Sequence, residues 1–178
     1  MRISSSTEQN LAEIKEESRS ETMASPPLTG KLEFDVEIDA TPEQFHHLFA
    51  HNPHHVHHTS SEKVHSCDLH EGEFGKSGSI ICWKYVHEGK TKTAKHVLEF
   101  DHDNKVIIFN LLEGDLLEEY KSFVVTVQTL PKKNGKGSIA HWIVEYEMLH
   151  DGIGHPESMR QFFIELTTDM GAHLVKDE

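Results

Sequence analysis

The C-terminal stretch HPESMRQFFIELTTDMGAHL, residues 155–174, decides how the rest of the chain folds. Its large apolar side chains recur every three or four residues, the spacing of one face of a helix. They are Met159, Phe162, Phe163, Leu166, Met170 and Leu174. Pro156 suits the first helical position, and Glu157 favours the first turn. We therefore expect a helix of about 20 residues whose apolar face another element must cover.

The chain before this helix alternates between apolar and polar residues. In Lys31–Asp39, Leu32, Phe34, Val36 and Ile38 alternate with charged residues, which is typical of a strand with one buried face. Similar segments follow, separated by turns rich in Gly, Asp or Asn. They are 63–69, 79–87, 91–101, 105–113, 118–129 and 138–149. Seven strands with no long helix between the last six predict an antiparallel sheet.

Two short helices are expected between the first and second strands. Thr41 followed by Pro42 is a good helix start, and Phe45 begins a set of apolar residues at helical spacing. Pro53 interrupts this helix, and a second short piece runs through Val56.

These elements predict an α+β fold in which a curved sheet wraps around one long helix. A twisted sheet of seven strands curls, and a single helix fills its concave side only where the inward side chains are large. Many of the side chains expected on the concave face of the sheet are bulky, but some are small or polar, such as Ser122 and His96. This mixture is typical of an apolar cavity with a few polar groups. A solid core remains the alternative from the pattern alone.

Composition excludes several partners. The 178 residues are 36% hydrophobic, enough for one domain with its own core. The net charge of −13 repels phosphate backbones and anionic membranes, so we expect no nucleic acid and no membrane insertion. Cys67 and Cys82 have no zinc-like spacing and are expected to be reduced thiols. With no secretory signal and no apolar run of roughly 18 residues, we expect a cytoplasmic monomer.

The chain divides into two regions. Residues 1–28 are rich in Ser and Glu, and such a segment buries too little apolar surface to offset its ordering entropy. We expect a disordered N-terminal extension there, in which Met23 is an alternative start, and a domain over 29–178. The extension suggests no role.

Several motifs between Lys31 and Glu157 together resemble a plant major latex protein. They are Lys31–Ile38, Phe45–Phe49, Pro53–Val56, Cys67–Lys76, Gly78–Ile80, Trp83, Tyr85–His87, Glu113–Leu117, Glu119–Phe123 and His155–Glu157. Major latex proteins belong to the Bet v I superfamily of pollen allergens and class-ten pathogenesis-related proteins. The resemblance implies the helix-grip fold, in which a seven-stranded curved antiparallel sheet, two short helices and a long C-terminal helix enclose a hydrophobic cavity.

The same resemblance implies a function. Members bind hydrophobic or amphipathic small molecules such as sterols, fatty acids, flavonoids or hormones, with roles in defence or stress response. The expected ligand-binding residues are Phe34, Val36, Trp83, Tyr85, His96, Ile107, Phe109, Leu111, Tyr120, Ser122, Met159, Phe162, Leu166 and Met170. Tyr85, Tyr120 or His96 is expected to orient the polar end of the ligand. No cofactor and no functional metal are expected.

Two other functions stay open at this point. Glu113, Glu145 and Tyr146 supply acid–base groups for a ribonuclease, and some superfamily members are small-molecule cyclases. Hormone-receptor relatives bind a phosphatase through a gate loop with a sequence like Ser-Gly-Leu-Pro-Ala. The corresponding loop here, His87–Lys90, departs from that pattern and weakens the receptor hypothesis.

Two local motifs invite other functions. Gly75-Lys76-Ser77 is similar to the end of a phosphate-binding loop, but position 70 is histidine and a strand is expected to follow. Seven of the thirteen residues from His46 to His58 are histidine, at spacings that include i, i+4. We expect surface histidines, because no nearby cysteine or carboxylate set completes a metal site. Metal binding by these histidines is the alternative.

Overall fold

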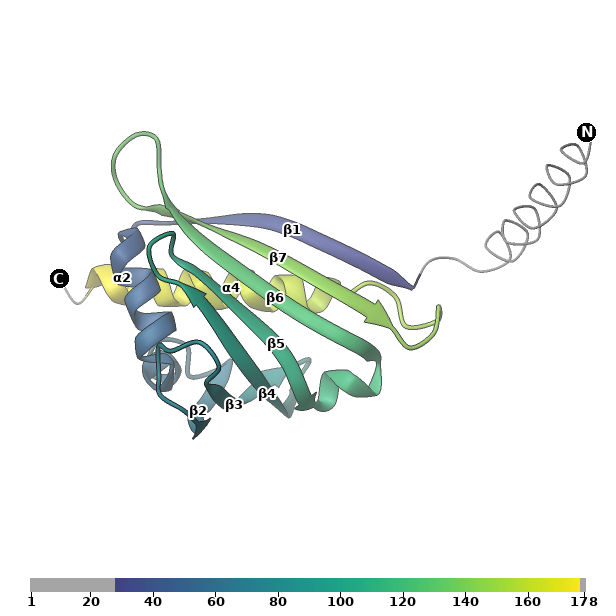
Figure 1. The fold of residues 1–178 in the computed structure, drawn as a ribbon. Helices are drawn as coiled ribbons and strands as arrows, with labels where there is room; N and C mark the ends of the chain where they lie inside the picture. The colour runs from purple at the N-terminus through teal and green to yellow at the C-terminus, as the bar shows by residue number, and fades with distance from the viewer. Residues whose placement is uncertain (1–27, 177–178) are drawn as a thin grey trace, which may run out of the picture.

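The computed structural model describes residues 28–176, in the order strand, short helices, six strands and long helix (Figure 1). The expected disorder of residues 1–28 and the alternative start at Met23 lie outside the described residues, apart from Leu28.

Seven antiparallel strands form one sheet in the described part of the chain. They are β1 (Thr29–Ile38), β2 (Val64–Glu71), β3 (Ile80–His87), β4 (Lys90–Asp101), β5 (Val106–Gly114), β6 (Tyr120–Pro131) and β7 (Ser138–Met148). Their order across the sheet is β1-β7-β6-β5-β4-β3-β2, so the first two strands of the chain form its two edges. The sheet curves around the long helix (Figure 1). The predicted antiparallel sheet of seven strands is confirmed.

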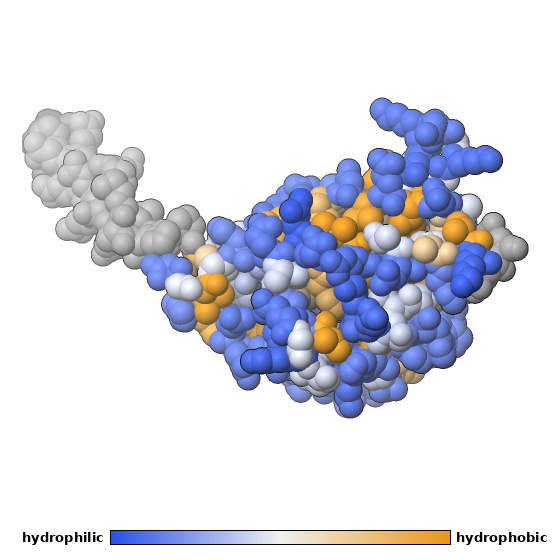
Figure 2. Space-filling view, turned by 180° about the vertical axis from the view of Figure 1, so that it is seen from behind, coloured by the Kyte–Doolittle hydropathy of each residue, from blue (hydrophilic) through white to orange (hydrophobic). Residues whose placement is uncertain are grey.

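Alternation along each strand explains why the sheet has one buried face. In β7, Ala140, Trp142, Val144 and Tyr146 are buried, and the residues between them are not. Every second side chain of a strand points to the same face, so these four turn toward the concave side. On the opposite side of the molecule from Figure 1, hydrophilic residues cover most of the surface (Figure 2).

The helical segment between β1 and β2 consists of four short pieces. They are α2 (Pro42–His46), the π-helical turn η1 (His47–His51), the 3-10 turn η2 (Pro53–His55) and α3 (Val56–Thr59). The Thr41 hydroxyl accepts a hydrogen bond from the Gln44 N–H at 3.0 Å, and Gln44 Oε1 accepts one from the Thr41 N–H at 2.8 Å. This reciprocal cap fixes the start of α2, as expected from Thr41-Pro42.

The long C-terminal helix, α4 (Glu157–Lys176), has the 20 residues that its apolar spacing predicts. Its buried side chains include Met159, Phe162, Leu166 and Met170. Gly171 allows close packing on β1, because a Cβ there would lie 2.7 Å from Ile38 Cγ2. The helix therefore closes the concave side of the sheet.

Candidate ligand-binding cavity

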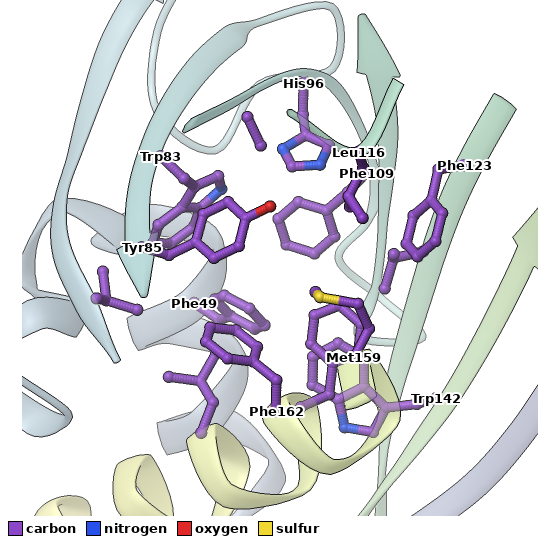
Figure 3. A pocket seen from close by; sticks show the side chains of 15 residues that line it. Phe49, Trp83, Tyr85, His96, Phe109, Leu116, Phe123, Trp142, Met159 and Phe162 are labelled. Atoms are coloured by element: carbon purple, nitrogen blue, oxygen red, sulfur yellow. The ribbon is translucent and has the colours of Figure 1, made fainter. Parts of the chain in front are cut away.

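A cavity of about 70 Å³ lies between the concave face of the sheet and α4. Fifteen side chains from nine helical and strand elements line it (Figure 3). They are Phe49, Val64, Trp83, Tyr85, Ala94, His96, Phe109, Leu116, Phe123, Val125, Trp142, Met159, Phe162, Phe163 and Leu166. Segments distant in the sequence thus converge on one apolar space.

Aromatic rings occupy much of the concave side and keep the cavity small. Phe49 contacts Phe109 and Trp83, with ring centroids 5.2 Å and 6.2 Å apart. Phe163 stacks on Trp142 at 4.8 Å. Ligand sites usually occupy about 300–1,000 Å³, so this cavity is smaller than a site for a large ligand. A sterol fits only if some of these side chains move.

Seven of the fourteen residues expected to bind the ligand border the cavity. They are Trp83, Tyr85, His96, Phe109, Met159, Phe162 and Leu166. Figure 3 shows Trp83, Tyr85 and His96 on the strand side, across the space from Met159 and Phe162 of α4.

Six other expected residues are buried in the core without lining the cavity. They are Phe34, Val36, Ile107, Leu111, Tyr120 and Met170. Phe34 stacks on the lining residue Trp142 with ring centroids 6.2 Å apart, so it forms a second layer. The Tyr120 hydroxyl donates to the Gly154 carbonyl at 3.3 Å, so its polar end already has a protein partner.

Ser122 is the one expected residue that faces outward, so the prediction that it lines the cavity is wrong. The pairing of β6 with β7 shifts register between Tyr120, opposite Met148, and Ser122, opposite Glu147. A bulge at this point inserts one residue, which reverses the alternation of side chains beyond it. Tyr120 is buried before the bulge and Phe123 after it, and Ser122 is exposed.

Eight lining residues are absent from the expected ligand-binding set, although one of them, Phe163, belongs to the predicted apolar face of the long helix. They are Phe49, Val64, Ala94, Leu116, Phe123, Val125, Trp142 and Phe163. Trp142 is at a buried position of an alternating strand, so the alternation in residues 138–149 is enough to predict that its side chain points inward. Phe49 comes from η1 rather than from the sheet, and no strand pattern indicates that it reaches the cavity.

Three of the lining residues carry buried polar atoms that lack partners in the described part of the chain. Tyr85 Oη, His96 Nδ1 and Trp142 Nε1 are buried and form no hydrogen bond within residues 28–176. Burial raises the pKa of Tyr85, and the Asp115 carboxylate raises it further. Desolvation lowers the pKa of His96 to about 4, although the residue as a whole keeps part of its surface accessible. At neutral pH both side chains are uncharged.

A serine and a histidine lie together beside the cavity, but their hydrogen bonds do not suit nucleophilic catalysis. Ser158 Oγ is 2.8 Å from His87 Nε2, and Lys92 Nζ is 3.0 Å from His87 Nδ1. Because an ammonium group only donates, Nδ1 accepts and the neutral ring carries its proton on Nε2. His87 then donates to Ser158 and is unable to take its proton.

The groups considered for ribonuclease chemistry do not come together. Tyr146 is buried on the concave face of β7, whereas its neighbour Glu145 is exposed on the other face. Glu113 is also exposed, and its carboxylate lies 3.4 Å from Lys95 Nζ. These three side chains therefore do not converge on one reacting atom.

The histidine-rich segment packs against the glycine-rich loop between β2 and β3. His102 Nε2 is 2.7 Å from the Gly75 carbonyl, and His46 Nε2 is 2.8 Å from His102 Nδ1. The carbonyl only accepts, so neutral His102 donates through Nε2 and accepts the His46 N–H at Nδ1. The surface expectation is wrong for His46, which is buried and whose pKa desolvation lowers to about 4.

Neither of the two alternative motif functions finds support here. Within residues 28–176, no three His, Cys, Asp or Glu side chains are grouped so as to hold a metal ion. The glycine-rich loop is followed by strand β3 rather than by the helix that a phosphate-binding loop requires.

Comparison with known proteins places this chain in a family. The model of the pathogenesis-related protein Bet v 1 family matches residues 27–177, and the chain belongs to that family. The family has a ligand-binding fold whose ligands are small hydrophobic molecules. Within the described residues, no helix is long and apolar enough to cross a membrane.

The relatives confirm the resemblance to major latex proteins. MLP-like protein 43 of Arabidopsis thaliana is 48% identical over 85% of this chain and 96% of its own length. MLP-like protein 34 of the same plant is 49% identical over 86% of this chain. The chain spans about half the length of that relative (49%). A crystal structure of ginseng major latex-like protein 151 has a TM-score of 0.78 at 37% identity, over 82% of this chain and 97% of that one. None of these three names describes an enzyme.

Proposed function

We propose that the protein binds a small hydrophobic or amphipathic molecule in the cavity and acts as a binding protein rather than an enzyme. The observation that carries this proposal is the pair of unpartnered polar atoms, Tyr85 Oη and His96 Nδ1, which belong to two residues that line an otherwise apolar space. A buried polar group without a hydrogen bond is unfavourable, so a partner from a ligand explains both atoms.

The expected affinity follows from the apolar area that a ligand buries. Burying about 300 Å² of ligand surface contributes roughly 7 kcal/mol before the loss of translational freedom, which suits micromolar binding. Because the cavity measures about 70 Å³, larger ligands require side chains of α4 to move. Met159 is suited to this, since an unbranched thioether side chain adapts its shape readily.

The biological setting is part of the proposal. The pathogenesis-related family supports a role in plant defence or stress response. Both cysteines, Cys67 and Cys82, are free, which supports a reducing compartment such as the cytoplasm.

Nuclear magnetic resonance tests the proposal directly, because both tryptophans of the sequence, Trp83 and Trp142, line the cavity. Naphthalene, which is uncharged and apolar, is titrated into the 15N-labelled protein. We expect saturable shifts of both indole N–H signals with one binding site.

A pair of variants on one strand supplies the control. Val125→Phe adds a ring on the cavity side of β6 and is expected to abolish naphthalene binding. Val124→Phe adds the same ring on the other face and is expected to leave binding unchanged. Indole signals that do not respond to naphthalene, or a Val125→Phe variant that binds as well as Val124→Phe, would contradict the proposal.

A further inference from the structure

The charge of the cavity restricts the ligand further than its apolar surface does. None of the fifteen lining residues is Lys, Arg, Asp or Glu. The polar side-chain groups of the lining residues are the phenol hydroxyl of Tyr85, the imidazole of His96 and the indole N–H groups of Trp83 and Trp142. Each of these groups forms hydrogen bonds, but none of them supplies a counter-charge at neutral pH.

The surroundings keep Tyr85 and His96 neutral. Tyr85 packs edge-on against Phe162 and His96 against Phe109, each with ring centroids 5.6 Å apart. This apolar environment raises the pKa of Tyr85 and lowers that of His96 to about 4. Neither group ionises near pH 7, so neither neutralises a charged ligand.

Nearby cations are engaged elsewhere. Lys92 pairs with Tyr85 across β3 and β4 and so shares its face, but its Nζ lies 3.0 Å from His87 Nδ1 and it does not line the cavity. Lys95 is beside His96 in β4, and its Nζ lies 3.4 Å from the exposed Glu113 carboxylate. A ligand carboxylate inside the cavity therefore meets no free ammonium group in its lining.

We propose that the cavity selects an uncharged ligand whose polar end is a hydroxyl or carbonyl oxygen bonded by Tyr85 Oη and His96 Nδ1, and that it excludes ionised carboxylates. This inference rests on the proposed function and names the ligand class of the same site. Figure 3 shows the Tyr85 hydroxyl directed into the cavity on the side where the His96 ring lies. A hydroxyl group both donates and accepts, so it matches either tautomer of His96.

A physical penalty separates neutral from charged ligands of equal length. Transferring an ion from water to an apolar site without a partner is far more unfavourable than transferring an alcohol. The difference corresponds to at least about thirtyfold in affinity. A free fatty acid has to lose the hydration of its charged carboxylate when it enters the cavity. A neutral ester or alcohol with the same number of carbon atoms does not carry this penalty.

Matched six-carbon ligands test the inference with the same two indole signals. Hexan-1-ol, hexanoate and hexylammonium are titrated at pH 7.5, with naphthalene as the reference. We expect hexan-1-ol to bind and both ions to bind at least about thirtyfold more weakly. In Tyr85→Phe, the affinity for hexan-1-ol should fall about three- to tenfold, and that for naphthalene should stay unchanged.

The outcomes separate this inference from the proposed function. If naphthalene does not bind, the proposed function fails. If naphthalene binds but hexanoate matches hexan-1-ol, the selection for neutral ligands is overturned, and loss of hexanoate binding in Lys92→Gln would then assign the carboxylate to Lys92. Equal loss of both hexan-1-ol and naphthalene in Tyr85→Phe would also overturn it, because that hydroxyl would then not recognise the polar end.

Discussion

At the scale of single residues, a binding site lowers the stability of the protein that carries it. The Tyr85 hydroxyl is buried without a partner within the described residues, so removing it relieves an unfavourable group. We expect Tyr85→Phe to stabilise the ligand-free protein by up to about 1 kcal/mol in urea unfolding. Tyr120→Phe is the matched control, because its hydroxyl donates to Gly154 and its loss should destabilise by about 1 kcal/mol. If both variants are destabilised alike, the Tyr85 hydroxyl already has a partner.

Gly75 and Gly78 separate backbone strain from steric contact in the glycine-rich loop. Both have positive φ, at 82° and 92°. A Cβ at Gly75 would overlap the His51 ring, whereas a Cβ at Gly78 meets nothing within 4 Å. Gly78→Ala should cost about 1 kcal/mol from φ alone. Gly75→Ala should cost at least about 1 kcal/mol more, and equal values from thermal or urea unfolding would show that the loop does not pack on His51.

His46 makes stability depend on pH. Desolvation and the neighbouring His102 and His51 lower its pKa from 6.5 to about 4 in the folded protein. Between these values the unfolded chain binds the proton and the folded protein does not, so stability falls as pH drops from 6.5 towards 4. We expect His46→Gln to flatten the dependence of the urea midpoint on pH between 7.5 and 5.

The control for this effect is the exposed His65, whose replacement by Gln should leave the slope unchanged. The contribution of His141 to stability changes with pH in the opposite direction to that of His46. Hydrogen bonding to Asp35 and Glu33 raises its pKa, so its contribution is present at low pH and is lost as pH rises through the folded value. A slope that is identical in the wild type and His46→Gln would show that His46 is not buried in the neutral form.

At the scale of elements, the contact between α4 and β1 explains why the helix contains a glycine. Replacing glycine by alanine within a helix normally gains about 1 kcal/mol. In Gly171→Ala, the new Cβ would lie 2.7 Å from Ile38 Cγ2 and push the helix from the strand. We expect a net loss of stability in urea unfolding. The exposed neighbour Ala172 is the control, and Ala172→Gly should lose about 1 kcal/mol from propensity alone. A gain in Gly171→Ala would contradict this packing.

Much of the fold can be predicted at the scale of elements, because its signals are local. The alternation of residues 31–39 and the Pro156 start of the long helix lead directly to β1 and α4. Which residues of β6 point inward does not follow from such local signals. A bulge depends on how two strands pair, and nothing in the residues around Ser122 indicates the extra position. One unpredicted bulge is enough to exclude Ser122 from the cavity and to include Phe123 and Val125.

Prediction of the site is limited by long-range packing. Phe34, Ile107 and Met170 are buried and apolar, as expected, but they do not line the cavity. Periodicity shows which face a residue occupies and not how far its side chain is from an internal space. The histidine segment has the same limit, because the hydrogen bonds that link His46 to Gly75 run through His102, which is far away in the sequence.

At the scale of the whole molecule, the account depends on whether the interior is able to enlarge. Met159 is 4% exposed and lines the cavity from α4. Met159→Ala should enlarge the space and tighten naphthalene binding several-fold. It should also lower stability by about 2–5 kcal/mol, as large-to-small core substitutions do. Titration calorimetry and urea unfolding measure the two effects. Lower stability with weaker naphthalene binding would indicate collapse of the cavity instead.

The measurement that tests the central claim most directly is diffraction from crystals of the protein under xenon pressure. Xenon binds in dry apolar cavities and needs no hydrogen bond, so it reports on the internal space without assuming a ligand. The account predicts one strong xenon peak bordered by Tyr85, Phe109 and Met159. Xenon confined to the surface, with side-chain density filling the space between the sheet and α4, would contradict it.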